Sequence, residues 1–436
     1  MTGQGMTRFA IRGRLLWFDA DPETDARARR FIEDGALLVE NGRIAAVGEA
    51  ADVLAGATGL RIVDHRPHLV TPGFIDPHIH VPQTQVVASY GTQLLDWLNR
   101  YTFVEEQRFA DPEHCARNAR FFLDELIRNG TTTALAYGSV HPQSVEAYFV
   151  EAEKRGARML GGKAMMDRNA PEALRDTAER GYRETKDLIQ RWHGRGRIGC
   201  AITPRFAITS TEAQLEACGA LAAEHPDCHV QTHMNENRSE IETVLSLFPD
   251  AKDYLAVYER FGLVSDNTVL GHCIHMSESQ WARMGAANAV PAFCPTSNLF
   301  LGSGLFDRRA AREAGLRVAL ATDIGGGTSY SMLATAAEAY KVLQMNGQGL
   351  SPLAALYAMT RGNAVALGLD DRIGSFFVGA ECDAVALDSR ATPAMARRME
   401  RAGTLEEEVF ALIMLGDDRA VVETYVMGEA SKSALA

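Results

Sequence analysis

The sequence of 436 residues predicts an α/β protein, a (β/α)8 barrel with a small β-sandwich-like domain formed by the N- and C-terminal segments. Two observations support this fold class. Eight apolar, strand-like runs alternate with helix-like segments through the middle of the chain, and both ends contain short β-like pieces separated by glycine turns. The expected division is residues 1–68 for the first part of the small domain, 69–370 for the barrel and 371–436 for the second part.

The eight runs are "LVTPGFIDPHIH", "TTTALAYG", "RMLGGKAMM", "RIGCAITP", "HVQTHM", "TVLGHC", "AVPAFCP" and "RVALATD". They are separated by segments such as "PEHCARNARFFLDELIRNG" and "SVEAYFVEAEKRGA", which have helical periodicity. Strands that are apolar on both faces and alternate with helices favour a parallel sheet, and eight of them fit a closed barrel. The competing fold is an open, doubly wound sheet. It is expected to carry a GxGxxG motif or a P-loop near its first strand, and the sequence has neither.

The two ends of the chain have similar patterns. Near the N-terminus, "FAIRGRLLWFD" and "GALLVENGRIAAVGEA" contain short strands, the second interrupted by the hairpin signal Asn41-Gly42. Near the C-terminus, "GSFFVGAECDAVALD" and "RAVVETYVMGE" are again β-like with glycine turns. We therefore expect the head and the tail to pair in one small domain.

Composition narrows the function classes. The formal net charge of -12 disfavours nucleic acid as a partner, because proteins that bind it usually present a basic patch. The seven cysteines are scattered and never form CxxC, which favours reduced thiols over disulfides or a thiolate metal site. No apolar run approaches the length of a membrane span. The expected partner is a small molecule, with no membrane contact, and the expected location is the cytoplasm.

Polar residues stand where several predicted strands end. In a barrel enzyme the carboxyl ends of the strands form one rim that carries the chemistry. The residues placed there are His78 and His80 after the first run, Arg205 and Phe206 after the fourth, His233 and Glu236 after the fifth, His272 after the sixth, and Asp323 after the eighth.

His78 and His80 are two residues apart, so in a strand their rings face the same side. Together with His233 and Asp323 they offer three imidazole nitrogens and one carboxylate oxygen, a donor set suited to zinc and less well to iron. The alternative for the His-x-His pair alone is a hydrogen-bonded strand end. His272 is open to three interpretations: a substrate contact, which we favour, a further ligand or a core histidine.

Glu236 follows His233 by three residues in "HMNENRSE". A carboxylate at the strand mouth can move the proton of a metal-activated water, as metal-assisted hydrolysis requires. The alternative is a carboxylate at the start of a helix, because "NENRSEIETV" resembles a helix N-terminus. Glu240 and Glu242 are expected on the solvated face of that helix.

The motifs "PGFIDPHIH", "QTHMNE", "LGHC" and "LATDIGGG", spread over this strand pattern, resemble the amidohydrolase superfamily along nearly the whole chain. Within it, "HIHVPQTQ" (78–85), "LLDWLNRYTFVEE" (94–106), "TPRFAITS" (203–210) and "LGDDRAVVETYVMG" (415–428) are similar to the guanine deaminases. The resemblance implies zinc ligands at His78, His80, His233 and Asp323, a proton shuttle at Glu236, a purine pocket of Gln83, Arg205, Phe206 and His272, and Trp97 in a covering segment.

The reaction implied by the resemblance is hydrolysis of guanine to xanthine and ammonia. Hydroxide generated at zinc, with Asp323 as ligand and base, attacks C2 while Glu236 protonates the adjacent ring nitrogen and His272 stabilises or orients the attacked edge. Binuclear superfamily members use a carboxylated lysine near the end of the fourth strand. Here "RIGCAITPRF" has no lysine and Lys163 ends nearer the third strand, so one metal ion per chain is expected, zinc or else iron.

Two alternatives stay open at the level of sequence. A deaminase of a pterin, 8-oxoguanine or a triazine would keep the metal site and change only the pocket. A catalytically silent barrel that serves as an assembly partner would be expected to have lost a ligand or Glu236, and none is missing. Relatives of this kind are commonly homodimers, and "LLDWLNRYTFVEE" is apolar enough to serve both as interface and as lid.

Overall fold

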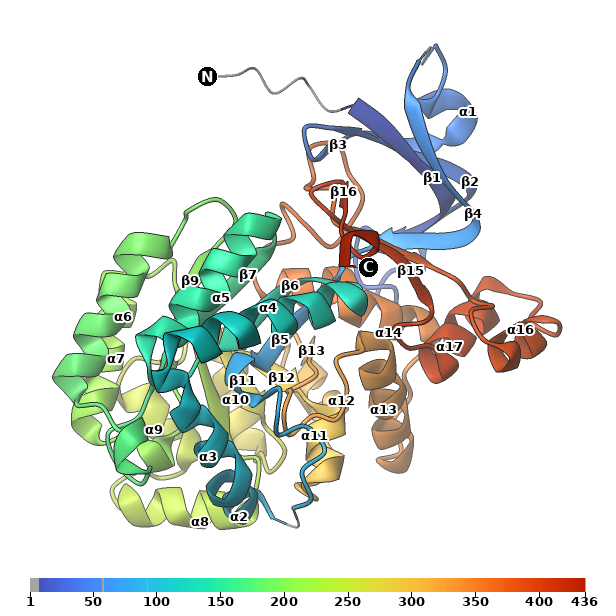
Figure 1. Cartoon of the computed structure of the whole chain (residues 1–436). Helices are drawn as coiled ribbons and strands as arrows, with labels where there is room; N and C mark the ends of the chain where they lie inside the picture. Colours follow the sequence, from blue (N-terminus) through green and yellow to red (C-terminus); the bar gives the residue numbers. More distant parts are fainter. Residues whose placement is uncertain (1–7, 57–58, 92, 436) are drawn as a thin grey trace, which may run out of the picture.

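The computed structural model describes residues 8–56, 59–91 and 93–435, and its larger part is a parallel barrel (Figure 1). The barrel strands neighbour one another in chain order, and every pair is parallel. They are β5 (Phe74–His80), β6 (Thr131–Tyr137), β7 (Arg158–Gly162), β9 (Gly199–Pro204), β10 (His229–Met234), β11 (Thr268–His272), β12 (Val290–Phe293) and β13 (Ala319–Leu320), with β8 (Ala164–Met165) paired to β9 off this path. The eight apolar runs are confirmed as the barrel strands.

The first and last strands meet through backbone hydrogen bonds just beyond β13. The amide of Asp323 donates to the carbonyl of His78 (2.9 Å), and the amide of His80 donates to the carbonyl of Ile324 (2.8 Å). The buried Asp76 carboxylate strengthens the same seam, because it accepts from the amide (3.2 Å) and the hydroxyl of Thr322. The residues that close the barrel are therefore neighbours of the predicted ligands.

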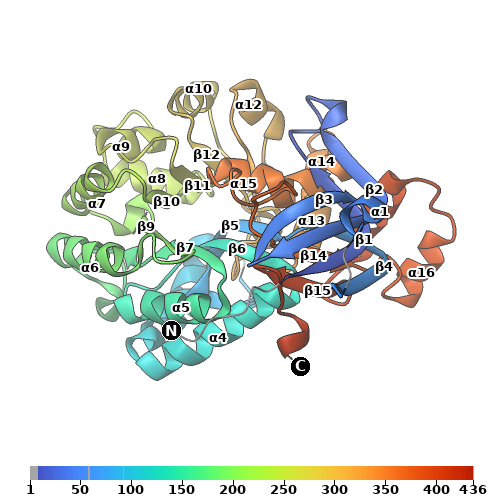
Figure 2. The same ribbon diagram turned by 90° about the horizontal axis from the view of Figure 1, so that it is seen from above.

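Helices surround the barrel, and Figure 2 shows α4 to α10 as an outer ring with the small domain beside it. Their ends follow local signals: α4, for example, has Asp111 as N-cap, Pro112 in its first turn and a buried apolar face. The helices are α1 (Ala50–Val53), α2 (Leu94–Trp97), α3 (Phe103–Glu106), α4 (Pro112–Arg128), α5 (Pro142–Arg155), α6 (Ala178–Trp192), α7 (Glu212–Glu224), α8 (Arg238–Leu247), α9 (Tyr254–Arg260), α10 (Glu278–Ala287), α11 (Pro295–Phe300), α12 (Arg308–Glu313), α13 (Met332–Met345), α14 (Pro352–Tyr357), α15 (Asn363–Ala366), α16 (Pro393–Met399) and α17 (Leu405–Leu415).

The two ends of the chain form one mixed sheet, as their similar patterns predict. Its order is β16-β15-β14-β4-β1-β2-β3, so strands from the tail lie beside strands from the head. The turn at Asn41-Gly42 joins β2 to β3 with both residues at positive φ (50° and 79°), which suits Asn-Gly. The strands are β1 (Arg8–Phe18), β2 (Arg29–Glu40), β3 (Arg43–Glu49), β4 (Arg61–Pro72), β14 (Ala384–Leu387), β15 (Val421–Val426) and β16 (Glu429–Ala430).

A buried cluster of ion pairs joins this sheet to the barrel. Glu381 accepts from Nε of Arg158 (2.9 Å) and from Nε of Arg197 (2.8 Å), and Arg197 also donates to Asp383 (3.2 Å). Arg158 begins β7 and Arg197 precedes β9, so the cluster lies at the amino ends of the barrel strands. It is therefore at the opposite end of the barrel from the predicted site.

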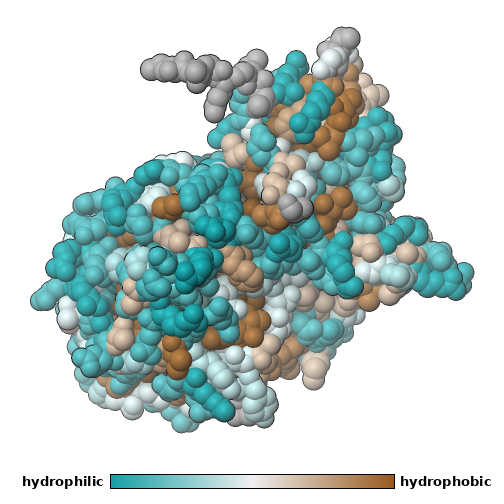
Figure 3. Space-filling model, in the orientation of Figure 1, coloured by the Kyte–Doolittle hydropathy of each residue, from teal (hydrophilic) through white to brown (hydrophobic). Residues whose placement is uncertain are grey.

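None of the helices in the described ranges is long and apolar enough to cross a bilayer. The face in Figure 3 is mainly hydrophilic over the barrel helices, and hydrophobic atoms gather on the small domain's sheet.

Candidate metal centre and active site

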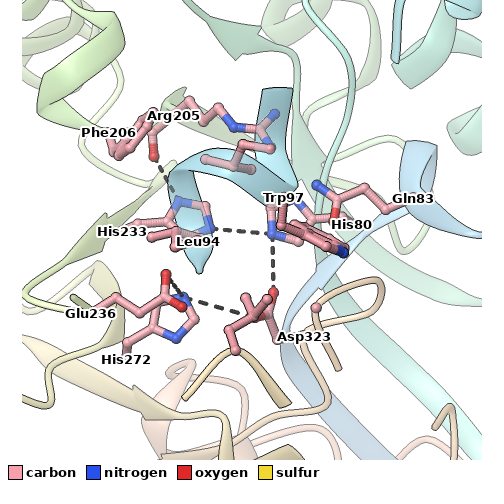
Figure 4. Close-up of a pocket in the computed structure, with 13 residues that line it drawn as sticks. His80, Gln83, Leu94, Trp97, Arg205, Phe206, His233, Glu236, His272 and Asp323 are labelled. Atoms are coloured by element: carbon pink, nitrogen blue, oxygen red, sulfur yellow. Dashed lines mark hydrogen bonds and ion pairs between the residues drawn. The ribbon is translucent and has the colours of Figure 1, made fainter. Parts of the chain in front are cut away.

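A pocket opens at the carboxyl ends of the barrel strands and brings the predicted residues together (Figure 4). Every predicted site residue except His78 lines it, and Nε2 of His78 lies 3.4 Å from the lining residue Asp323. The lining comprises His80, Gln83, Leu94, Trp97, Leu98, Arg205, Phe206, His233, Glu236, His272, Leu301, Asp323 and Gly326. The short helix α2 covers one side, so the segment expected as a lid does lie over the pocket.

The four predicted ligands converge. Nε2 of His80 lies 3.2 Å from Nε2 of His233 and 3.2 Å from Oδ1 of Asp323, and Nε2 of His78 lies 3.4 Å from the same carboxylate oxygen. The histidines come from β5 and β10, and Asp323 follows β13. Strand ends far apart in the sequence thus place their donor atoms around one point.

His272 lies closer to this cluster than the sequence indicates. Donor atoms of His78, His233, His272 and Asp323 all lie within 4.8 Å of one another. Nε2 of His272 is 3.8 Å from Oδ2 of Asp323 and 3.3 Å from Oε2 of Glu236. The geometry therefore allows both the ligand and the substrate-contact interpretations of His272, and its place in the pocket lining disfavours the third, a core histidine.

The nitrogens of the cluster fit a bound cation. Both ring nitrogens of His78 are buried and have no hydrogen-bond partner among the described residues, although Asp323 Oδ1 lies 3.4 Å from Nε2. Nδ1 of His233 donates to the carbonyl of Arg205 (2.7 Å), so the Nε2 lone pair faces the cluster. The buried imidazoles of His78 and His80, the partly buried imidazole of His233 and a carboxylate form a donor set typical of zinc.

The pKa shifts of these residues favour the protonation states that metal binding requires. Burial lowers the pKa of His80 to about 4 and lowers the pKa of His233 well below its usual range, so both rings are neutral near pH 7. Burial alone would raise the pKa of Asp323, but the adjacent rings of His78 and His80, whose Nε2 atoms lie 3.4 Å and 3.2 Å from its Oδ1, hold that pKa well below its usual range. Neutral imidazoles and an ionised carboxylate are the forms that bind a metal.

Glu236 is buried beside the cluster, in surroundings that favour its protonated form. Burial, reinforced by the nearby Asp323 carboxylate, raises its pKa to about 8. Its Oε1 accepts from the hydroxyl of Ser303 (2.9 Å). Nδ1 of His272 donates to Oδ1 of Asn298 (2.9 Å), so the Nε2 lone pair of His272 faces Glu236. A protonated Glu236 is placed to donate a proton into the pocket.

Glu240 corrects one expectation. The sequence placed it with Glu242 on a solvated helix face; Glu242 is exposed, but Glu240 is fully buried. Its Oε2 accepts from the amides of Glu236 (2.8 Å) and Asn237 (3.1 Å), which forms a capping box at the start of α8. A charged side chain at a helix start usually faces water, whereas here it fixes the loop that carries Glu236.

The remaining predicted pocket residues surround the opening. Phe206 presents its ring 6.4 Å from that of His233, and the indole nitrogen of Trp97 donates to the carbonyl of Ser89 (3.1 Å).

Lys163 is buried away from the pocket lining and its ammonium lies 2.7 Å from Asp176. Its amine is therefore engaged in an ion pair and does not reach the donor cluster.

Several functional positions were missed by sequence reasoning. The lining residues Leu94, Leu98 and Leu301 are ordinary apolar residues, although the apolar run "LLDWL" is a signal for two of them. Asn298 and Ser303 meet the site only through tertiary contacts, and no local pattern marks them. The most consequential omission is Glu106, which contacts both Gln83 and Arg205.

Known proteins share the fold of this chain. The chain belongs to the amidohydrolase family, whose family model matches residues 69–430. It is 48% identical to the guanine deaminase of Escherichia coli over 423 residues, 96% of each chain. The solved structure of that guanine deaminase has a TM-score of 0.95 to this chain, with 46% identity, 97% of this chain and 99% of that chain covered.

A more distant structure, the guanine deaminase of C. acetobutylicum with guanine bound in its active site, has a TM-score of 0.88 and 29% identity, with 97% of this chain and 100% of that chain covered. The resemblance to guanine deaminases that the sequence motifs predict is therefore confirmed along nearly the whole chain.

Proposed function

We propose that this protein hydrolyses guanine to xanthine and ammonia with one zinc ion per chain. The observation that carries the proposal is the pocket itself, where Glu236 and a cluster of metal donors face the hydrogen-bonding side chains of Arg205 and Gln83 (Figure 4). The guanine deaminases that match the chain over nearly its whole length support the choice of substrate.

The metal would be held by His78, His80, His233 and Asp323, with His272 as the substrate contact beside it. A zinc ion held there would supply Lewis acidity, which would activate water for attack near pH 7. The ion pair of Lys163 with Asp176 supports a site with one ion rather than two, since a bridging carboxylated lysine is not available from that side chain.

Recognition of the purine is assigned to three side chains. Arg205 donates to O6, Gln83 offers a donor and an acceptor to a ring edge, and Phe206 provides an aromatic face for stacking. Trp97, Leu94 and Leu98 would cover the ring and exclude water. This pose directs C2 and the exocyclic amine toward Glu236, His272 and Asp323.

The protons can be followed through the reaction. Asp323 takes one proton of the attacking water as its oxygen adds to C2, and Glu236 gives its proton to N3, the ring nitrogen beside C2. Asp323 then passes its proton to the exocyclic amine, and the C2–N bond breaks to release ammonia. The remaining hydroxyl proton returns to Glu236 as the C2 carbonyl of xanthine forms, while His272 orients the attacked edge.

The test is ammonia release from guanine, isoxanthopterin and 8-oxoguanine by purified protein with its metal content quantified. Rapid turnover of guanine by protein with about one zinc per chain supports the proposal. Turnover of only another compound would keep the metal mechanism and replace the substrate, and iron in place of zinc would change the cofactor. No turnover of any of the three by metal-loaded protein would contradict the proposed function.

We also propose that the protein is a cytoplasmic homodimer. All seven cysteines are buried and unbridged, which suits a reducing compartment. Tyr90 and Val104, beside and within the covering segment, are 75% and 57% exposed and offer apolar surface to a second copy. Light scattering after size exclusion tests the dimer, and a monomer at micromolar concentration would contradict it.

A further inference from the structure

We propose that Glu106 is a positioning residue that makes the pocket select purines with an oxygen at position 6. The inference rests on the proposed function and deepens it. Glu106 does not line the pocket, so it acts on the substrate through Arg205 and Gln83, which do. It is the last residue of α3, in the segment that also covers the pocket.

The carboxylate of Glu106 holds the guanidinium of Arg205. Nη1 of Arg205 donates to both carboxylate oxygens, at 2.8 Å and 2.7 Å. The ring of Phe103, one helical turn before Glu106, lies 5.5 Å from the guanidinium carbon. In the part of the chain that the structure describes, no acceptor is bonded to Nε or Nη2 of Arg205. The donors left over are those available to an acceptor on the substrate.

The same carboxylate fixes the amide of Gln83. Nε2 of Gln83 donates to Oε1 of Glu106 (3.0 Å), and Oε1 of Gln83 accepts from the amide of Gly325 (3.0 Å). A carboxylate only accepts and a backbone amide only donates, so these two partners leave one orientation of the Gln83 amide. One N–H and one oxygen lone pair of Gln83 then remain for the ring edge.

Because Glu106 and Arg205 are buried, the contact between them fixes the direction of the Arg205 donors. Glu106 has no exposed surface and Arg205 is 2% exposed, so water cannot replace either partner. Glu106 is the one carboxylate among the described residues that forms an ion pair with Arg205. Without that charge, the guanidinium would lack its partner and its remaining donors would lose their fixed direction.

The consequence is selection at position 6 of the purine. A 6-oxo group accepts from the donors that Glu106 orients, whereas a purine without that oxygen leaves them unpaired in a dry pocket, which costs free energy. Loss of the Glu106 charge should therefore weaken the binding of 6-oxopurines and leave the binding of other purines nearly unchanged.

The experiment compares Glu106→Gln and Glu106→Asp with the matched control Glu105→Gln. Glu105 is also a buried carboxylate of α3, but it pairs with His114 (3.1 Å) and Arg108 (2.8 Å) outside the pocket. Each protein is assayed for kcat and KM on guanine, zinc per chain and Tm. Inhibition constants for hypoxanthine, which carries the 6-oxo group, and for purine, which lacks it, are measured in parallel.

For Glu106→Gln we expect an unchanged zinc content. The value of kcat/KM on guanine should fall by about 30- to 100-fold, mainly through a higher KM. The affinity for hypoxanthine should fall by a similar factor, and the affinity for purine should change by less than about 3-fold. Glu106→Asp, which keeps the charge but is one methylene shorter, should be intermediate and carries the test where the glutamine variant does not fold. The control should remain within about 2-fold of wild type.

Equal weakening of hypoxanthine and purine, or unchanged constants in both Glu106 variants, would overturn the inference. The two proposals fail separately. Wild-type protein that does not turn over guanine contradicts the proposed function, while the ratio of the dissociation constants of hypoxanthine and purine, measured by calorimetry without turnover, still decides the role of Glu106.

Discussion

Replacing Glu236 by glutamine should have opposite effects on activity and stability. The variant has nearly the same shape, and its amide can accept from Ser303 and donate to the Nε2 lone pair of His272, so the contacts of the acid at 2.9 Å and 3.3 Å persist. It cannot transfer a proton. We expect kcat on guanine to fall by about 10²- to 10⁴-fold with zinc content unchanged.

The stability effect follows from the raised pKa of Glu236. A carboxyl group whose pKa is higher in the folded than in the unfolded protein contributes stability at low pH, and that contribution is lost as pH rises through the folded value. Here the pKa rises from 4.5 to about 8, which at 1.36 kcal/mol per pH unit corresponds to about 5 kcal/mol lost by pH 8. Glutamine does not ionise and should avoid this loss.

The assay is thermal unfolding of chelator-treated wild-type and Glu236→Gln protein from pH 5 to pH 8.5. The two should have similar Tm near pH 5, and the variant should become more stable as pH rises, by about 3–6 °C at pH 8 for a chain of this length. Zinc-loaded protein should show a smaller difference, because the cation stabilises the wild-type carboxylate. A Tm difference that is independent of pH would refute the reasoning, as would a variant that retains kcat.

Three further predictions concern the metal, acid pH and the ion cluster. Chelation should abolish activity and lower Tm, and one equivalent of zinc per chain should restore both, since a ligand at about 1,000 times its Kd stabilises by about 4 kcal/mol. Burial lowers the pKa of His229, whose Nε2 donates to the carbonyl of Leu367 (3.0 Å). The unfolded protein therefore takes up a proton at this histidine before the folded protein does, and the free energy of unfolding should fall as pH drops below about 6.5. The fall should be smaller in His229→Gln. Glu381→Gln should cost about 3 kcal/mol in urea unfolding because Arg158 and Arg197 lose a shared carboxylate, with kcat unchanged at the far end of the barrel. An unfolding free energy that stays constant between pH 5 and pH 7 would contradict the prediction for His229, and a lower kcat in Glu381→Gln would contradict the prediction for the ion cluster.

Much of the fold follows from local patterns. Apolar runs separated by helical segments identify the barrel strands because each strand is buried on both faces. His78, His233 and Asp323 each stand where a predicted strand ends. Because the carboxyl ends of parallel strands share one edge of the barrel, the sequence places these residues at one rim. These arguments need only the order of residues along each strand.

Contacts that depend on loops escaped prediction. Glu240 has the sequence surroundings of a solvated helix start, and its burial depends on how the loop carrying Glu236 folds back over α8. Glu106 lies 99 residues from Arg205 and 23 from Gln83, so no periodic pattern relates them. His272 is close to Asp323 because β11 and β13 bring their ends together, a distance that strand order alone does not give.

Backbone strain is concentrated at the same rim. Asn235, His272 and Asp323 have φ of 51°, 71° and 53°, in the left-handed region that non-glycine residues rarely occupy. Each such residue costs roughly 1–3 kcal/mol, and glycine would remove the strain together with the side chain. At His272 and Asp323, which both line the pocket, this conformation occurs at or just after the end of a strand. The hydrogen bonds that close the barrel at His78 and His80 hold the strained ends in place, so the closing seam supports the convergence of the donors.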